Sequence, residues 1–343
     1  MTDWPRVLLA GLALAAAAAL VAAGATSGAA FAPYNPSWEG TAELRERADA
    51  AGPGDPLLRD AARYDDLEAE GTLAVVLSPE TAYGTDAERL REFVRRGGTL
   101  LVAEDFGPHA NPLLADLGAS TRVDGRPLYD TRRYYRQPDL PVADGVADNP
   151  LVADVPSLTL NRPTAVRPGE ATVLVETSEY AYVDADGDGE LDDDEALGAR
   201  PVATVEPVGD GRVVVLADPS VFIDRMLERQ DNTVFVDGLL ASHDRVVLDV
   251  SHAGALPLLQ RVVFAVRDSG GLLALVGGLA LGAVALLAGG RLDGRRRDPD
   301  ATAPRLSAEE VRTLLARRHP DWDEAAIDRI TTRLGRDRQG EGR

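Results

Sequence analysis

The chain has 343 residues and a net charge of −20, from 56 acidic and 36 basic residues, and it contains no cysteine. The missing cysteine excludes disulfides, thiolate zinc sites, lipoprotein anchoring and a cysteine nucleophile. So acidic a surface also disfavours nucleic acid as a partner, because phosphates would meet repulsion rather than release counterions.

Every basic residue is an arginine, since the sequence contains no lysine. This composition favours a halophilic protein: molar salt shortens the Debye length to about 3 Å, so a highly acidic surface stays hydrated without destabilising the fold. An ordinary acidic protein from a GC-rich genome is the alternative.

The first element is an apolar run, Val7–Ala23, which follows Arg6. Its length is close to the roughly 20 residues that span a bilayer, so we expect residues 1–24 to form an N-terminal transmembrane anchor. Small residues at Ala25–Ala32 would suit a cleaved signal peptide instead. Whether the run is retained or cleaved is open at this stage.

The central stretch is Thr72–Gly107, where two short runs rich in Val and Leu flank a helical pattern. Leu73–Leu77 and Thr99–Ala103 read as strands, and the helix between them begins behind Asp86, which can cap its first turn. Gly97 supplies a left-handed residue where the helix stops. Strand, helix and strand with tight connections predict a βαβ unit with parallel, buried strands.

The other elements of residues 25–268 alternate in the same way. The pattern predicts three further helices and five further strands: Thr41–Ala50, Asn111–Leu117 and Thr233–Ser242, then Thr172–Glu176, Tyr180–Val183, Pro201–Val205, Arg212–Ala217 and Arg245–Val250. Residues 124–150 read as an irregular excursion. We therefore expect an α/β fold with a three-layer sandwich of sheet and helices.

A second apolar run, Leu272–Ala288, predicts a transmembrane helix over residues 269–290. The arginines at 291–297 place the tail, residues 291–343, in the cytoplasm by the positive-inside rule. With both spans retained, the N-terminus is also cytoplasmic and residues 25–268 lie outside the cell membrane. Residues 27–260 carry a net charge of −23 and the tail carries +2, which fits two compartments.

The tail contains a small helical module at Leu306–Leu334. Ser307 and Glu310 form a capping box for one helix, and Asp321 or Asp323 can cap a second. Two helices make a thin core, so we interpret this module as a docking element.

The sharpest chemical motif is D-x-D-x-D-G-x5-E, the calcium loop of EF-hands, with Gly189 at its turn. It predicts calcium as a structural cofactor, bound by carboxylates and one backbone carbonyl of Asp184, Asp186, Asp188, Glu190, Asp192 and Glu195. The flanks look like strands, so we expect an isolated loop rather than a paired sensor. The alternative is an acidic loop that matches by composition.

Acidic and histidine residues also follow several predicted strands. A metal or acid–base site from Asp105, His109, Asp218 and His252 is conceivable, because ligands bind at the carboxyl ends of strands in open α/β sheets. The alternative is that these carboxylates cap helices and tie loops. No G-x-S-x-G elbow supports a serine hydrolase, and no nucleotide-binding motif occurs.

Residues 34–250 resemble a family of uncharacterised membrane proteins, the domain of unknown function numbered 4350, in its haloarchaeal form. The resemblance is carried, in order, by YNPSWEGTAELR, LAVVLSP, FVRRGGTLLVAEDFG, NPLLADLG and GRVVVLADPSVF. It implies a flavodoxin-like sandwich similar to class I amidotransferases and intraflagellar-transport sheet domains. It also implies an archaeal source and membership of a membrane assembly beside MoxR-type ATPases.

Two departures from the resemblance bear on activity. Bacterial members often carry an Asp-Glu-x-His-His-Gly-like segment, whereas the stretch Asp249–Gly254 here lacks the Glu and one His, and amidotransferase activity needs a cysteine. We therefore expect a membrane-anchored, non-catalytic domain that binds a protein partner or a small ligand. The alternative is a surface hydrolase or metal-dependent enzyme that uses the carboxylates and His252.

Overall fold

The computed structural model describes residues 29–253, 269–289, 308–319 and 322–330, together with Val262 and Val266. The chain divides into two compact units, Met1–Asp268 and Ser269–Arg343. The first predicted span, Val7–Ala23, lies outside the described residues.

An eight-stranded mixed sheet forms the centre of the first unit, in the order β1-β14-β2-β3-β13-β12-β10-β7. Neighbours among the first five strands are parallel, and the last three are added antiparallel. In sheet order these strands are Leu57–Leu58, Arg245–Asp249, Thr72–Leu77, Thr99–Ala103, Gly211–Leu216, Pro201–Val208, Thr172–Glu176 and Gly145–Val146. The prediction of an α/β fold around a mostly parallel sheet is confirmed.

The predicted βαβ unit is present as β2, α3 (Ala87–Arg95) and β3, and β2 pairs with β3 in parallel. Both strands are buried along almost their whole length, as expected of a parallel sheet with covered faces. Helix α3 presents Leu90, Phe93 and Val94 to the core. One detail differs: the side chain of Asp86 caps no helical N–H and instead faces Arg89 and His252 at 3.6 and 3.4 Å.

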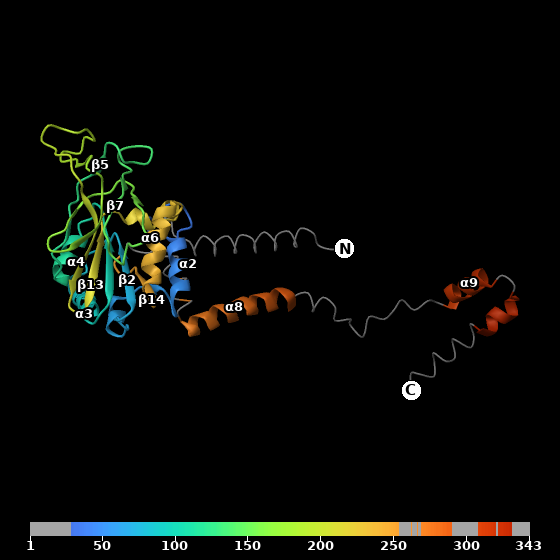
Figure 1. The fold of residues 1–343 in the computed structure, drawn as a ribbon. Coiled ribbons are helices and arrows are strands. Elements are labelled where there is room, and N and C mark those ends of the chain that lie inside the picture. Colours follow the sequence, from blue (N-terminus) through green and yellow to red (C-terminus); the bar gives the residue numbers. More distant parts are fainter. Residues whose placement is uncertain are drawn as a thin grey trace. The chain divides into compact units, whose positions relative to one another are not determined.

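Helices cover both faces of the sheet (Figure 1). α2 (Ala42–Ala51) and α6 (Gln230–Ala241) lie together on one side, and α3 and α4 (Ala110–Leu117) pack against each other on the other. Short helical turns fill the connections: η1 at Ala61–Asp65, η2 at Gly84–Asp86, η3 at Pro219–Phe222 and α5 at Asp224–Leu227. The result is the three-layer arrangement that the alternating pattern predicts.

The antiparallel part of the sheet begins with a hairpin, β12 to β13, whose strands the sequence predicts as Pro201–Val205 and Arg212–Ala217. Its two-residue turn is Gly209-Asp210, and Gly209 has φ +64°, a backbone conformation that glycine adopts without strain. A Cβ at Gly209 would also lie 2.8 Å from the Cα of Arg95, so the turn packs closely on α3. The position needs glycine on both counts.

The irregular excursion contains more pairing than its sequence suggests. Two ribbons pair a strand inside the excursion with a strand that follows it, β5 with β11 and β6 with β8. A third ribbon, β4 with β9, joins the segments on either side of it. Their bounds are Leu128–Asp130, Ala181–Val183, Arg122–Val123, Val166–Arg167, Val142–Ala143 and Leu158–Thr159. The sequence predicts one of these strands, β11, as Tyr180–Val183. The others have two or three residues each, which is too few for a period to appear in the sequence.

The second unit contains α8 (Gly270–Gly289), which includes the second predicted span, and α9 (Ala308–Arg318). Among the helices that the structure describes, none is both long and apolar enough to cross a membrane. The predicted tail module is helical at α9 and at residues 324–330, and the side chain of Asp323 accepts from the N–H of Ala326.

Candidate functional site

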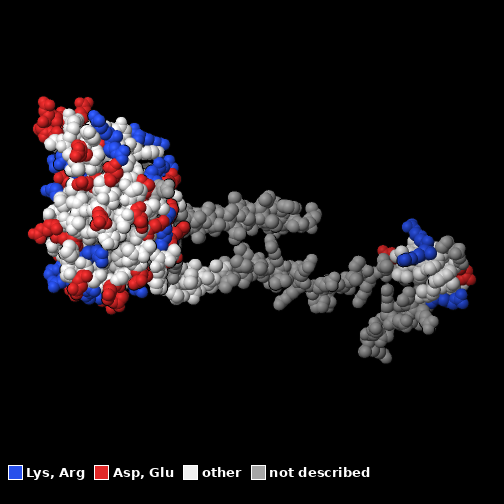
Figure 2. Space-filling model, in the orientation of Figure 1, with Lys and Arg blue, Asp and Glu red and all other residues white. Residues whose placement is uncertain are grey.

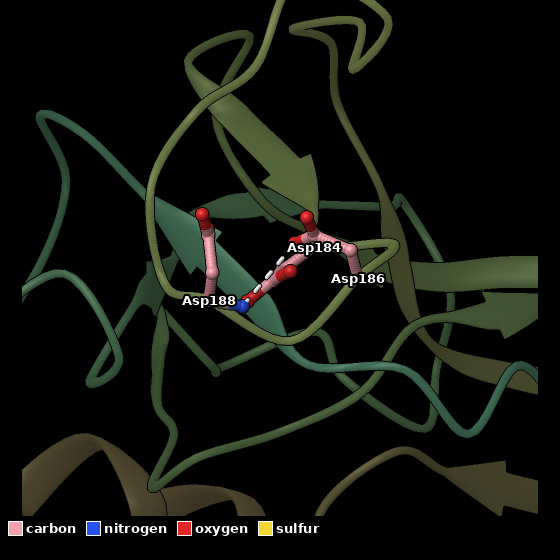
Figure 3. Close-up of side chains that lie close together, drawn as sticks. All are labelled: Asp184, Asp186 and Asp188. Atoms are coloured by element: carbon pink, nitrogen blue, oxygen red, sulfur yellow. Dashed lines mark hydrogen bonds between the residues drawn. The ribbon is translucent and has the colours of Figure 1, made fainter.

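The acidic loop predicted to bind calcium directly follows strand β11. Asp184 lies at the end of the strand and is buried, whereas Asp186 and Asp188 are exposed. Carboxylate oxygens of these three residues all lie within 4.8 Å of one another, and Figure 3 shows the three side chains around the turn. Within the described ranges, no other group of three His, Asp or Glu residues is as close.

Asp184 organises the turn through its two carboxylate oxygens. Oδ1 accepts from the N–H of Gly187 at 2.6 Å, and Oδ2 accepts from the N–H of Gly189 at 2.9 Å. Gly189 has φ +79°, the left-handed conformation that a sharp turn at this position of a calcium loop requires. The sequence pattern thus produces the local backbone that the motif predicts.

Glu195, the last residue of the motif, closes the loop in a different way. Its Oε1 accepts from the N–H of Ala185 at 2.6 Å, and its Oε2 accepts from the N–H of Asp192 at 3.3 Å. The carboxylate therefore ties both ends of the loop together. Of the six predicted ligands, the structure groups Asp184, Asp186 and Asp188, and it leaves Glu190, Asp192 and Glu195 outside that group.

The loop concentrates negative charge at one end of the domain, where acidic side chains gather at the tip near β5 in Figure 2. Asp188 is the main reason that the pKa of Asp192 is raised. Burial, followed by the charge of Asp184, raises the pKa of Tyr182 to about 12. A bound cation would relieve this repulsion, and oxygen-only ligands suit Ca²⁺.

Two tyrosines, Tyr129 and Tyr182, pack against the loop, and the sequence predicted a role for neither. The rings of Tyr129 and Tyr182 stack with centroids 5.5 Å apart, across the β5–β11 pair. The hydroxyl of Tyr182 donates to the carbonyl oxygen of Gly189 at 3.2 Å. The aromatic pair therefore fixes the glycine turn against the body of the domain.

A second set of acidic residues lies at the carboxyl ends of the parallel strands. Asp249 ends β14 and is buried; its Oδ2 accepts from the hydroxyls of Tyr64 and Tyr83 at 3.0 and 3.1 Å. Its Oδ1 accepts from the N–H and the hydroxyl of Ser251. Burial raises the pKa of Asp249 despite these hydrogen bonds.

Asp218 and Glu104 follow β13 and β3, and both are fully buried. Asp218 accepts from the N–H groups of Ser220 and Asn161 at 2.7 and 2.6 Å, while burial raises its pKa to about 7. Burial likewise raises the pKa of Glu104 to about 6. Glu104 Oε1 accepts from two backbone N–H groups, whereas Oε2 has no hydrogen-bond partner among the described residues.

The remaining predicted residues of this edge serve local structure. His252 faces Thr81 through Nδ1 at 3.1 Å and Asp86 through Nε2 at 3.4 Å, with its ring against Tyr83. Asp105 accepts from the N–H of the next residue, and His109 precedes α4 without capping it. Within the described ranges, Asp105, His109, Asp218 and His252 form no group with metal-ligand spacing.

Comparisons with known proteins place the chain among proteins of unknown function. A family model described as "Domain of unknown function (DUF4350)" matches residues 33–240, more than half of the chain. No curated protein matches the chain.

Solved structures match parts of the chain at low similarity. The "mmIFT52 N-terminal domain" is 17% identical with a TM-score of 0.41, over 52% of this chain and 78% of its own. A β-galactosidase from the Antarctic haloarchaeon Halorubrum lacusprofundi is 19% identical with a TM-score of 0.30, over 49% and 22%. The β-galactosidase from Rahnella sp. R3 is 16% identical with a TM-score of 0.32, over 50% and 22%. The chain thus spans less than a quarter of these two enzymes.

Proposed function

The chain belongs to the family described as Domain of unknown function (DUF4350), and we propose that residues 29–253 form a binding domain rather than a catalytic one. The domain recognises a protein partner or a small ligand as part of a membrane assembly. Calcium stabilises the loop at its tip.

The main support is that two carboxylates at the carboxyl ends of the strands, Asp249 and Asp218, already accept hydrogen bonds from the protein itself. Asp249 is held by two tyrosine hydroxyls and Ser251, and Asp218 is held by two backbone N–H groups. A catalytic carboxylate needs a free oxygen within reach of substrate. The oxygens of Asp249 and Asp218 instead accept hydrogen bonds from nearby protein donors, as expected of residues that hold loops in place.

One observation favours the alternative, a surface hydrolase or metal-dependent enzyme. Buried acids whose pKa values approach neutrality are typical of catalytic sites, and the pKa values of Glu104 and Asp218 are about 6 and about 7. Structural burial produces the same effect, however, and no histidine of the described residues is paired with either carboxylate. We therefore place this function second.

Calcium binding is the finer part of the proposal. The support is local: three carboxylates within 4.8 Å, a left-handed glycine at the sixth position, and a loop closed by Glu195. Outside a cell, even a site with a Kd of about 10⁻⁴–10⁻³ M is occupied. The metal would serve structure, because the loop extends beyond the central sheet (Figure 1).

Membrane attachment and the relation to flavodoxin-like folds are also proposals. The support for attachment comes from the sequence, through the apolar runs and the arginines at 291–297, which favour a domain outside the membrane and cytoplasmic termini. The fold proposal rests on the three layers and the parallel strands. A flavodoxin-like sheet has the order 2-1-3-4-5, whereas here β14 lies between β1 and β2, so the relation is to a variant of that plan.

The experiment that tests the binding role is co-purification of the tagged full-length chain from native, cross-linked membranes. The wild-type chain should recover the same partner repeatedly. A matched chain carrying Val76→Asp, which disrupts the sheet, should reach the membrane fraction but lose the partner. Recovery that does not depend on a folded domain, or turnover of an ester or glycoside panel that is lost in Asp218→Asn, would contradict the proposal.

A further inference from the structure

A cavity of about 160 Å³ lies near the buried Asp218, which follows the carboxyl end of strand β13. Four segments distant in sequence form it: the loop with Trp38, residues 135–140 of the excursion, residues 159–161, and the segment from Ile223 to Arg229 that contains α5. Backbone hydrogen bonds fix these segments, since Arg225 N–H donates to the carbonyl of Trp38 and Tyr135 N–H donates to that of Leu140. Asn161, also in the wall, donates its N–H to Asp218.

The charge of this cavity is opposite to that of the domain around it. Arg136, Arg225 and Arg229 all line it, and no Asp or Glu does. Residues 27–260 carry 43 acidic side chains against 20 arginines, so a wall with three arginines and no acid is unusual for this chain. Glu228 pairs with Arg225 and Arg229 from outside the lining. The cavity therefore favours a negatively charged ligand.

Arg136 is the arginine best placed to meet such a ligand. Among the described residues it forms no ion pair, and its guanidinium lies 5.0 Å from the ring of Tyr135. Its φ of +68° is a left-handed conformation that costs an arginine conformational energy. Arg229 approaches the same ring at 4.8 Å, so two cations share one aromatic side chain.

Most of the remaining lining of the cavity is apolar, and Thr159 and Asn161 are its polar members. Leu140, Leu160, Ile223 and Met226 contribute to its walls, and Trp38 stands beside it with 62% of its surface exposed. At ligand sites, large apolar side chains supply contact area that is buried on binding, while a few polar groups fix the orientation of the ligand. An apolar cavity of about 150 Å³ accommodates benzene, so this one is large enough for a single ring.

We propose that this cavity is a binding site for a ring-sized carboxylate, whose ring lies against Trp38 and the apolar wall and whose carboxylate pairs with Arg136 and Arg229. The inference rests on the proposed binding role and gives that role a ligand class. Arginine suits the task because its planar guanidinium matches a carboxylate with two parallel hydrogen bonds.

The probe is benzoate, titrated into the full-length chain while tryptophan fluorescence is measured. Trp4→Phe and Trp322→Phe leave Trp38 as the only tryptophan, so the signal reports on the cavity. Acetate carries the charge without the ring, and benzyl alcohol carries the ring without the charge. Sodium chloride keeps the ionic strength constant. Benzoate should produce a saturable change, whereas acetate and benzyl alcohol should not.

Variants then assign the effect to the arginines. Arg136→Gln and Arg229→Gln should each weaken benzoate binding roughly tenfold, as loss of a charge-assisted hydrogen bond predicts. Arg91→Gln is the matched control, because Arg91 lies on α3 and pairs only with Glu88 among the described residues. If one cavity variant fails to fold, the other decides the result.

The proposal is overturned if benzoate gives no saturable change, if either partial probe binds as well, or if both cavity variants bind like wild type. The proposed ligand class and the proposed binding role can be tested independently. A negative benzoate titration together with a partner whose recovery needs the folded domain would remove the ligand class and leave the role intact.

Discussion

Asp184 is the residue on which the acidic loop depends, because it is buried and accepts from two glycine N–H groups. If calcium binds here, it binds only to the folded loop and stabilises the domain by RT ln(1 + [Ca²⁺]/Kd), about 1 to 3 kcal/mol at saturating calcium. Thermal melts of the full-length chain at fixed high salt, with calcium and then with chelator, should show a higher melting temperature with calcium.

Two pairs of substitutions distinguish calcium bound at the loop from a general effect of added cations on its negative charge. Asp184→Ala with Glu195→Ala should abolish the calcium response. Asp193→Ala with Asp194→Ala removes equal charge from non-ligating positions of the same loop and should retain it. A melting temperature that calcium leaves unchanged in wild type would rule out the site.

Glu104 gives a pH prediction, because its pKa is raised from 4.5 in the free side chain to about 6 in the folded protein. The unfolded chain releases this proton first as pH rises, so the stability contribution is present below pH 4.5 and lost as pH passes through about 6. Glu104→Gln stays neutral and escapes this loss. Between pH 4.5 and 8, wild type should lose on the order of 2 kcal/mol more stability than Glu104→Gln.

Denaturant unfolding at several pH values measures this difference. Glu88→Gln, at an exposed position of α3, is the control and should follow the wild-type pH dependence. Parallel curves for wild type and Glu104→Gln would show that Glu104 ionises normally in the folded domain.

At this scale, local patterns could be predicted from the sequence and distant partners could not. The turn at Gly189 follows from a motif of twelve consecutive residues, and the structure contains it. The partners of Asp249 could not be anticipated, because Tyr64 and Tyr83 lie 185 and 166 residues away. Nothing in the neighbourhood of either tyrosine marks it as a hydrogen-bond donor to a buried acid.

Among the elements, β2 is the best target for a test of the sheet. Val76 is 1% exposed and lies between Val102 of β3 and Asp249 of β14. Val76→Asp would bury a second carboxyl group beside Asp249, at a cost of several kcal/mol. The variant should lose cooperative thermal unfolding of the first unit by circular dichroism.

Leu197→Asp provides the comparison, because Leu197 is exposed and the same change of side chain there should alter stability little. If Val76→Asp melted at the wild-type temperature, the central position of β2 would be wrong.

The lengths of the elements show why hydrophobic periodicity predicts some of them and misses others. β2, α3 and β3 have five or more residues each, enough for a period to appear, and the sequence predicts all three. β1 and β7 have two residues each and leave no period. The position of β14 between β1 and β2 is also hidden, because pairing between distant strands depends on the assembled sheet. The cavity beside Trp38 is unpredictable for the same reason.

For the whole molecule, the orientation across the membrane is testable with an external protease. An arginine-specific protease added to intact cells should cut the excursion turn, where Arg132, Arg133 and Arg136 are exposed or partly exposed. The tail after Arg291 should be spared, because the arginines at 291–297 predict a cytoplasmic tail by the positive-inside rule. Mass spectrometry of the released peptides measures both.

Permeabilised cells provide the control, since the tail should then be cleaved as well. Tail peptides released from intact cells would reverse the orientation.

The central sheet ends on both sides in a strand of two residues, β1 at one edge and β7 at the other. In concentrated brine, charge repulsion between neighbouring molecules reaches only about 3 Å, so it cannot keep copies apart. Long bare edges would then recruit one another strand by strand. Edge strands of two residues offer almost no template for such growth. If the domain lies at a cell surface, as proposed, its short edge strands should therefore keep crowded copies from associating when charge repulsion cannot.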